Sequence, residues 1–305
     1  MNYNIDNTDW DSYFSSNPND NNLDDEDVKV GFEFRPMSEV IAEEKNQKLK
    51  IPKSEKNDLL KIIAYPTNKS KLKQRPMMKE GIIPKHPSRM IFNGKSGSGK
   101  SNLLINLMTQ PHFYGRTKRS DPKSQYFDLV FLFSPTADGQ DDLVKFLELP
   151  EKRICTNFDE EALNKIFDVQ DSIIKEKGLD KAPKILIIFD DIQSDSKFMR
   201  SKSFTRAFIQ GRHCNMSIAV CCQSWTKLPR VCRLQGSDIF FFPSSQSEVE
   251  VVSEEYCPPN TTKKQFRELV QHATGEQYQF LYISCNSKPE KRFRKNLDTI
   301  LSVSK

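Results

Sequence analysis

The sequence has little glycine and no long apolar run. Only 11 of its 305 residues are glycine, so a short segment that concentrates them stands out. No stretch of about 18 apolar residues occurs, which argues against a membrane-spanning helix. The first residues are rich in Asn and Asp and lack the basic and apolar segments of a secretory signal peptide. We therefore expect no membrane partner.

The seven cysteines lack the spacing of a metal site or a disulfide framework. There is no C-x-x-C pair and no histidine at a ligand spacing from a cysteine. Four of them fall where the apolar pattern predicts buried structure, namely Cys214, Cys221, Cys222 and Cys232. We expect reduced thiols in the core of an intracellular protein.

Charge is distributed unevenly along the chain. Residues 1–27 contain eight acidic residues and no Lys or Arg. Because the net charge of the whole chain is +5, the other 278 residues carry +13. A basic body suits a polyanionic partner, and the acidic segment would either compete for the same surface or only keep the protein soluble.

One segment concentrates glycine, Gly94-Lys95-Ser96-Gly97-Ser98-Gly99-Lys100-Ser101. It follows the strand-like residues 90–93 and precedes residues 102–108, which have the apolar spacing of a helix. This is G-x-x-x-x-G-K-[ST] in the strand–loop–helix context of a phosphate-binding loop. Glycines let successive N–H groups point at phosphate oxygens, and the helix adds the positive end of its dipole.

The last two residues of this motif have distinct predicted roles. Lys100 would reach the β- and γ-phosphates of ATP, and the Ser101 hydroxyl would ligate Mg²⁺. The alternative is a flexible Gly/Ser loop that matches by accident.

A second group of polar residues follows the apolar run Ile185–Phe189. Asp190 and Asp191 would stand at the carboxyl end of a buried parallel strand, where such sheets bind ligands. We expect Asp190 to hold Mg²⁺ through water and Asp191 to orient or deprotonate the attacking water. Alternatively, the two acids only cap the helix that follows.

A third group lies in residues 211–224. Gln223 ends an apolar run, so we expect it either to sense the γ-phosphate or to cap the strand. Arg212 precedes that run. It would act on the site of a neighbouring subunit by stabilising the transferred phosphoryl group, or it would form a surface salt bridge.

Strand-like and helix-like segments alternate between residues 85 and 285. This alternation predicts an α/β fold with a mostly parallel sheet and helices on both faces. We expect four regions: a disordered acidic tail at 1–30, a basic Pro-containing linker or arm at 31–84, a P-loop ATPase domain at 85–285, and a basic C-terminal tail at 286–305.

The segments GKSGSGKS, ILIIFDD and GRHCNMSIAVCCQSWTKLP, in that order, resemble the FtsK–HerA superfamily. The most similar members are genome-packaging ATPases of virophages, polinton-like elements and large DNA viruses of the poxvirus-type lineage. The resemblance covers about residues 85–285 and implies a RecA-like core that hydrolyses Mg-ATP. It also implies a homo-oligomeric ring, a pentamer or hexamer, that translocates double-stranded DNA and packages a viral genome. A capsid vertex protein as partner, and a location in the host cytoplasm or the virion, follow from the same resemblance.

Residue by residue, Lys100 and Ser101 match the phosphate loop of this family, and Asp190 and Asp191 match its second motif. Gln223 matches the polar sensor and Arg212 the trans-acting arginine. Several relatives carry Glu where this chain has Asp191.

Two other classes of nucleotide-dependent enzyme remain as alternatives. A P-loop phosphotransferase such as a nucleoside kinase would share the phosphate loop, but tandem acids with a strand-end Gln fit water activation better. A DNA helicase-type ATPase would share the whole set of motifs. A GTPase is disfavoured because no N-K-x-D segment is present.

Overall fold

The computed structural model describes residues 74–118, 124–137 and 141–301, which all belong to one compact unit. The predicted acidic tail at 1–30 and residues 31–73 of the predicted linker lie outside the described residues. Across the described part, no helix has the length and apolar character needed to cross a membrane.

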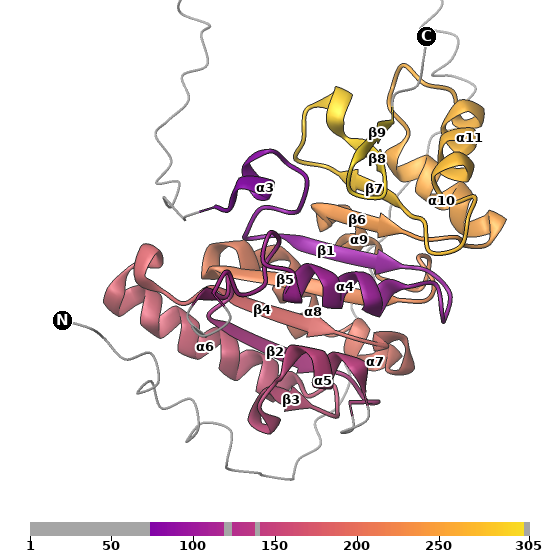
Figure 1. Cartoon of the computed structure of the whole chain (residues 1–305). Coiled ribbons are helices and arrows are strands. Elements are labelled where there is room, and N and C mark those ends of the chain that lie inside the picture. The colour runs from indigo at the N-terminus through magenta and orange to yellow at the C-terminus, as the bar shows by residue number, and fades with distance from the viewer. Residues whose placement is uncertain (1–73, 119–123, 138–140, 302–305) are drawn as a thin grey trace, which may run out of the picture. The chain divides into compact units, whose positions relative to one another are not determined.

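A single sheet organises this unit (Figure 1). In the described residues it has nine strands in the order β3-β2-β4-β5-β1-β6-β7-β8-β9. The strands from β3 to β6 run parallel to one another, whereas β7, β8 and β9 are antiparallel to their neighbours. The bounds are β1 Arg89–Asn93, β2 Leu129–Phe133, β3 Ile154–Cys155, β4 Ile185–Phe189, β5 Met216–Cys222, β6 Asp238–Phe241, β7 Leu281–Ser284, β8 Phe293–Lys295 and β9 Thr299–Leu301.

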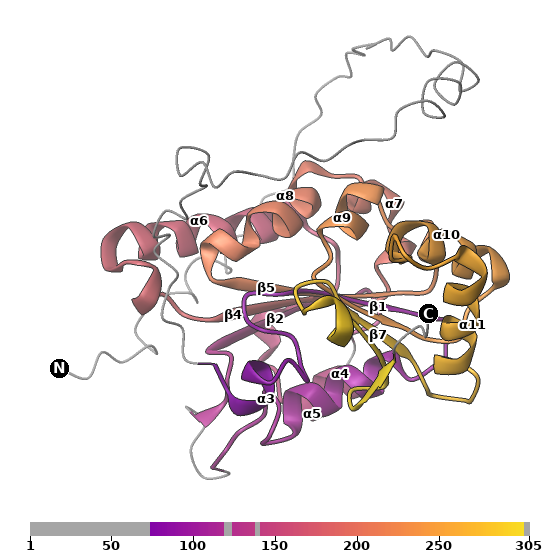
Figure 2. The same cartoon turned by 90° about the horizontal axis from the view of Figure 1, so that it is seen from above.

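Helices cover both faces of the sheet (Figure 2). The helices α3, α4 and α5 lie on one face, and α6, α8 and α9 lie on the other. The bounds are α3 Pro76–Lys79, α4 Lys100–Thr109, α5 Asp142–Leu147, α6 Glu160–Lys177, α7 Ser196–Met199, α8 Lys202–Gln210, α9 Arg230–Gln235, α10 Gln246–Tyr256 and α11 Lys263–Ala273. The predicted α/β fold with a mostly parallel sheet is therefore confirmed.

Continuous apolar sequence explains the central strands. Every residue of β2, β4 and β5 is buried, as expected for strands covered by helices on both faces. Alternate residues of these strands enter two separate cores, one under each helical layer. The seven cysteines are free thiols, and the four singled out from the sequence are buried.

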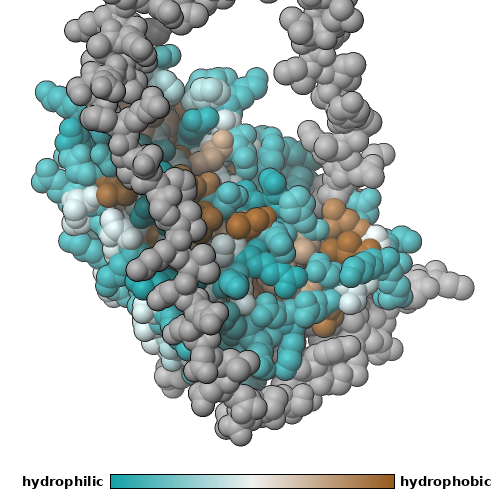
Figure 3. All heavy atoms as spheres, turned by 180° about the vertical axis from the view of Figure 1, so that it is seen from behind, coloured by the Kyte–Doolittle hydropathy of each residue, from teal (hydrophilic) through white to brown (hydrophobic). Residues whose placement is uncertain are grey.

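The outer face of the α6–α8–α9 layer is mainly hydrophilic (Figure 3). Helices α8 and α9 nevertheless expose three large apolar side chains there, Ile209, Val231 and Leu234. Ile209 is the one such residue on α8, and Val231 and Leu234 are three positions apart on α9. Single exposed apolar side chains of this kind are ordinary on protein surfaces.

The sequence predicts helices at residues 160–177 and 263–273, which match α6 and α11, but the single helix that it predicts at residues 197–212 is wrong. The single expected helix is instead α7, a break at Arg200 and Ser201, α8, and a 3-10 turn at Gly211–Cys214. Ser201 causes the break, because its extended backbone ends one helix and its side chain accepts a hydrogen bond from the Phe204 N–H at the start of the next.

Two of the three predicted domain boundaries lie in the described residues, and the structure corrects both. Residues 286–301 are not a tail, because β8 pairs with β7 and β9 pairs with β8. At the other end, α3 packs on the body, with Met78 and Ile83 buried in one of the two cores. The linker prediction is thus wrong for residues 76–84.

Candidate functional site

The phosphate-loop motif connects the end of β1 to the start of α4. Gly97 and Gly99 have φ angles of 72° and 103°, which residues with side chains rarely adopt. Gly99 is also the N-cap of α4, so the loop runs directly into the positive end of the helix. The Gly94 N–H donates to the Cys222 carbonyl at 3.1 Å, which fixes the loop against β5.

Lys100 is held across the base of this loop. Its Nζ donates to the carbonyl oxygens of Gly94 at 2.7 Å and Lys95 at 2.9 Å. The ammonium group therefore lies within the loop, where phosphate oxygens would be bound.

The loop forms one wall of a hollow of about 340 Å³. The other walls come from the carboxyl ends of β2, β4 and β5, where parallel sheets bind ligands. The hollow is lined by Ser96, Gly97, Gly99, Lys100, Ser101, Asn102, Thr136, Asp190, Asp191, Cys221 and Gln223. The structure thus brings most of the predicted site residues together from three separate segments.

Asp190 follows the last residue of β4 and is anchored by its backbone. Its N–H donates to the Phe133 carbonyl at 2.9 Å. Burial raises the pKa of its carboxyl group, and the nearby acids Asp141 and Asp191 raise it further, while the Cys221 thiol opposes them with a hydrogen bond. A cation beside Asp190 would favour the ionised form.

Asp191 has a left-handed backbone, with φ of 49°. Its carboxylate Oδ1 accepts a hydrogen bond of 2.9 Å from Nε2 of Gln223. This contact joins the second and third sequence motifs, so the polar side chain that ends β5 contacts an acid beside the loop.

Two positioning residues escaped sequence reasoning. Oε1 of Gln193 accepts from the backbone N–H groups of Gln223 at 3.2 Å and Ser224 at 3.1 Å, and its Nε2 donates to the Ser224 carbonyl at 2.5 Å. Glu248, on α10, accepts from Ser224 Oγ at 2.7 Å and from the backbone N–H of buried Trp225. These contacts fix the chain directly after β5.

Sequence signals for these residues differ. The position of Gln193, two residues after Asp191, could have suggested a role. Nothing local marks Glu248 or Thr136, because only the tertiary fold brings them near the site.

Arg212 lies at the amino-terminal end of β5, whereas the hollow lies at the carboxyl end of that strand. It precedes β5, whereas Gln223 follows β5, so roughly 20 Å of strand separates them. Burial and then the charge of Arg212 lower the pKa of Arg89, which begins β1. The structure therefore does not place Arg212 in the site of its own chain.

The residues at the hollow fit a Mg²⁺ ion that is held mainly by water and phosphate. No cluster of three or more His, Cys, Asp or Glu residues in the described ranges could hold a metal by itself. Ser101 and Asp190 nevertheless line the same hollow and each offers an oxygen ligand. Mg²⁺ is commonly bound by one or two protein oxygens together with substrate phosphates.

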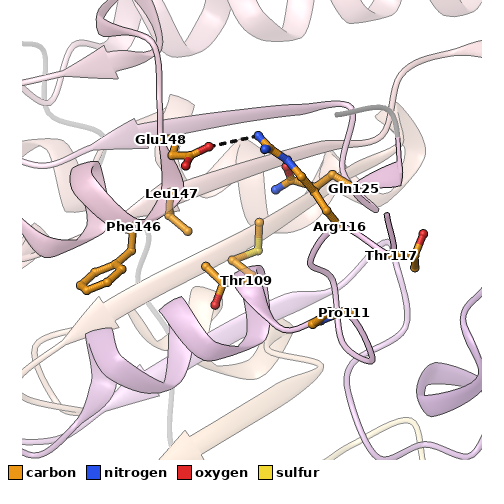
Figure 4. Close-up of a pocket in the computed structure, with 9 residues that line it drawn as sticks. Thr109, Pro111, Arg116, Thr117, Gln125, Phe146, Leu147 and Glu148 are labelled. Atoms are coloured by element: carbon orange, nitrogen blue, oxygen red, sulfur yellow. Dashed lines mark ion pairs between the residues drawn. The ribbon is translucent and has the colours of Figure 1, made fainter. Parts of the chain in front are cut away.

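A second hollow, of about 450 Å³, lies where α4 and α5 end (Figure 4). Arg116 and Glu148 face each other across it as an ion pair of 3.3 Å. Phe146 is 59% exposed beside it. This hollow shares no residue with the one at the phosphate loop.

Several relatives share part of the sequence. The DNA packaging protein OPG160 of Variola virus is 24% identical over 183 residues, which are 58% of this chain and 60% of that protein. The protein of the same name from Vaccinia virus (strain Copenhagen) has the same identity and coverage. The chain thus spans about three-fifths of the length of these relatives.

Among solved structures, the genome packaging NTPase B204 from Sulfolobus turreted icosahedral virus 2 in complex with ATP-gammaS is 14% identical. The match has a TM-score of 0.48 and covers 70% of this chain and 98% of that chain.

Residues 77–292, most of the chain, match the family described as Poxvirus A32 protein. This match includes the phosphate loop, both acids and Gln223. The chain therefore belongs to the Poxvirus A32 protein family.

Proposed function

We propose that this protein hydrolyses ATP to translocate double-stranded DNA, and that it packages a viral genome into a capsid. The observation that carries the proposal is the convergence of the phosphate loop, Asp190 and the Asp191–Gln223 pair on one hollow. The names of the relatives, which are DNA packaging proteins, support DNA as the partner. The net charge of +13 outside residues 1–27 also suits a polyanion.

The loop would bind the triphosphate through its backbone and Lys100. Glycines at positive φ and the N-terminus of α4 present N–H groups to phosphate oxygens. The Lys100 ammonium would exchange its bonds to two loop carbonyls for bonds to the β- and γ-phosphates.

Ser101 and Asp190 would hold Mg²⁺, Ser101 directly and Asp190 through water. When bound, the ion neutralises charge on the phosphate groups. Asp190 supplies a carboxylate, and the backbone N–H of this residue is hydrogen-bonded to β2.

Asp191 would act on the attacking water. The water oxygen forms a bond to the γ-phosphorus, its proton passes to the Asp191 carboxylate, and the bond from that phosphorus to the bridging oxygen of ADP breaks. Gln223 holds Oδ1 of Asp191, which leaves Oδ2 to accept from the water. Gln193 and Glu248 fix the backbone around Gln223 so that this contact persists.

Arg212 would act in a neighbouring subunit of a homo-oligomeric ring, a pentamer or hexamer. Because it lies at the edge of the sheet away from its own loop, it suits a role toward another subunit better than one in its own site. A capsid vertex protein would receive the ring, in the virus factory of the host cytoplasm or in the virion.

The test is ATP turnover with duplex DNA, single-stranded DNA or nucleoside acceptors. We expect turnover that duplex DNA stimulates most strongly and that Lys100→Ala abolishes. Stimulation by single strands alone would favour the helicase-type alternative. Phosphorylation of a nucleoside would establish the phosphotransferase alternative and refute the proposal.

A further inference from the structure

A third hollow, of about 360 Å³, lies at the amino-terminal ends of the parallel strands. The phosphate loop lies at their carboxyl ends. Asp238, the first residue of β6, and Ser284, the last of β7, form part of its floor. Its rim comes from two segments that are far apart in sequence, the one around α3 and the one between β7 and β8. These segments lie beside each other at the same end of the sheet (Figures 1 and 2). We call this hollow the edge pocket.

Basic side chains converge on the edge pocket. Three come from the expected basic C-terminal tail, one comes from the expected linker, and Lys85 is the first residue of the expected ATPase domain. They are Lys79, Lys85, Lys288, Lys291 and Arg294. Residues about 200 positions apart in the sequence thus bring five positive charges to one pocket.

These cations have no acidic partner in the described part of the chain. The ion pairs found there involve other residues, so none of the five charges is neutralised by a neighbouring carboxylate. The hollow of Figure 4 provides a contrast, because its Arg116 is paired with Glu148. Five unpaired cations around one hollow produce a positive potential that attracts anions.

Arg294 gives the edge pocket a fixed donor. The residue is only 4% exposed, and one terminal nitrogen donates to the Leu297 carbonyl at 2.9 Å. The buried Nε has no hydrogen-bond partner in the described residues. A buried guanidinium nitrogen without an acceptor is costly, and an anion in the pocket, which Arg294 lines, would offset part of that cost through its charge.

Two acids lie at the edge pocket, and neither makes it a cation site. Asp238 accepts from Ser237 Oγ and Tyr282 Oη, both at 2.7 Å, so its oxygens are already satisfied. Burial raises its pKa, whereas hydrogen bonds from Ser237, Tyr282 and Ser284 lower it. Glu80 is exposed on the rim.

We propose that the edge pocket binds a phosphate group, and that in the working motor this group is a backbone phosphate of duplex DNA. Phosphate matches a buried guanidinium surrounded by lysines better than a carboxylate would, because it offers more acceptor oxygens. The choice of DNA as the source rests on the proposed function. The preference for phosphate rests on the pocket alone.

The test compares two charge-matched variants. The pocket variant is Lys288→Gln with Lys291→Gln, which leaves the buried Arg294 in place. The control variant is Lys175→Gln with Lys177→Gln, a pair of exposed lysines at the end of α6. Thermal unfolding checks that both remain folded. Duplex DNA affinity is then measured by fluorescence anisotropy from 50 to 200 mM KCl.

We expect the pocket variant to bind duplex DNA about tenfold more weakly at 100 mM salt. The slope of log K against log salt should be smaller by about one, since the pocket holds one backbone phosphate and each lost phosphate contact reduces the slope by about one. The control variant should keep the wild-type slope. Equal slopes in the two variants would overturn the assignment to DNA.

A second measurement separates the pocket from the proposed function. Inorganic phosphate binding is followed by calorimetry in a Lys100→Ala background, which disables the phosphate loop. Loss of phosphate binding in the pocket variant but not in the control variant supports the edge pocket. This holds even if the wild-type protein binds no duplex DNA. Absence of duplex binding would instead refute the DNA part of the proposed function. Loss of phosphate binding with an unchanged DNA slope would show that the pocket takes free phosphate and overturn its assignment to DNA. Phosphate binding that is equal in both variants would overturn the pocket itself.

Discussion

The side-chain amide of Gln223 donates a hydrogen bond of 2.9 Å to Oδ1 of Asp191. The two residues are 32 positions apart and follow adjacent parallel strands, β5 and β4. The contact fixes the direction of the Asp191 carboxylate while leaving its second oxygen for water. It also joins an acid beside the phosphate loop to the segment after β5, where Glu248 of α10 accepts from Ser224 Oγ.

Asp191→Asn is expected to lower ATP turnover by about 10²–10⁴-fold, because an amide cannot accept the proton of the attacking water. ATP binding should remain within a few-fold of wild type, since the phosphate loop and Asp190 are unchanged. Single-turnover hydrolysis and equilibrium binding measure the two effects separately. The matched control is Asp180→Asn, an exposed acid away from the site, which should leave both unchanged. If nucleotide binding fails while hydrolysis of bound ATP is normal, Asp191 is a metal ligand instead.

Much of this site could be predicted from the sequence, because its chemistry is carried by contiguous motifs. The loop at residues 94–101 and the acids after β4 stand at strand ends, and parallel strands bring their carboxyl ends to one edge. Gln193 and Glu248 could not be assigned in the same way. Both contact backbone N–H groups of the segment after β5, which is distant in sequence. The position of Gln193 close to Asp191 is a weak signal, and nothing local marks Glu248.

Gly99→Ala is expected to destabilise the loop by about 1–3 kcal/mol, because a φ of 103° strains any residue with a side chain. The added Cβ would also lie 3.3 Å from Cδ1 of Tyr278. Gly97→Ala is the matched control, since it has a φ of 72° and open space around the new Cβ. The rise in melting temperature that ATP produces measures the effect. It should shrink more for Gly99→Ala, and equal shifts in both variants would contradict the packing of Tyr278 on the loop.

His86 should make stability depend on pH. The ring is buried between Ser217 and Asn215, with Nδ1 2.7 Å from Ser217 Oγ and Nε2 2.8 Å from Asn215 Oδ1. Asn215 Nδ2 donates to the Ala182 carbonyl, so Oδ1 accepts from the ring and Nδ1 is left to accept from Ser217. Burial lowers the pKa of His86 to about 4, and the charge of Lys184 adds to this effect.

The sign of the pH effect follows from that lowered pKa. Below pH 6.5 the unfolded chain binds a proton at this histidine, whereas the folded protein does not until about pH 4. The contribution of His86 to the free energy of unfolding is therefore fully present above pH 6.5. It falls by about 3 kcal/mol as the pH drops to 4. Urea unfolding across this range should show a steeper loss for wild type than for His86→Gln. The exposed-residue control His272→Gln should follow wild type, and identical curves for all three proteins would refute the assignment.

The central fold was predictable and its margins were not. Nearly continuous apolar runs identify β2, β4 and β5, in which Ser217 of β5 is the one polar residue, because strands buried on both faces take mainly apolar side chains. By contrast, β8 is three residues long and contains Arg294 and Lys295, which suggested a solvated tail. It joins the sheet because Phe293 packs in the core and Arg294 lies in the edge pocket.

Arg212 provides a test of the ring. If it acts on a neighbouring subunit, the Arg212→Ala protein should bind ATP normally. Its rate of ATP hydrolysis should be lower by about 10³-fold or more. Mixing it with Lys100→Ala protein should restore part of the activity, because an intact Lys100 and an intact Arg212 then meet at some interfaces. Sedimentation of the mixture checks that subunits exchange. A monomeric protein with full ATPase activity that loses it on Arg212→Ala would contradict a trans role.

Triplex displacement is the measurement that tests the central claim most directly. A third DNA strand bound in the major groove of a linear duplex is removed only by a motor that moves along double-stranded DNA. We predict release of that strand with ATP, and none with Lys100→Ala protein or without Mg²⁺. ATP hydrolysis that is stimulated by the duplex while the third strand stays bound would contradict translocation.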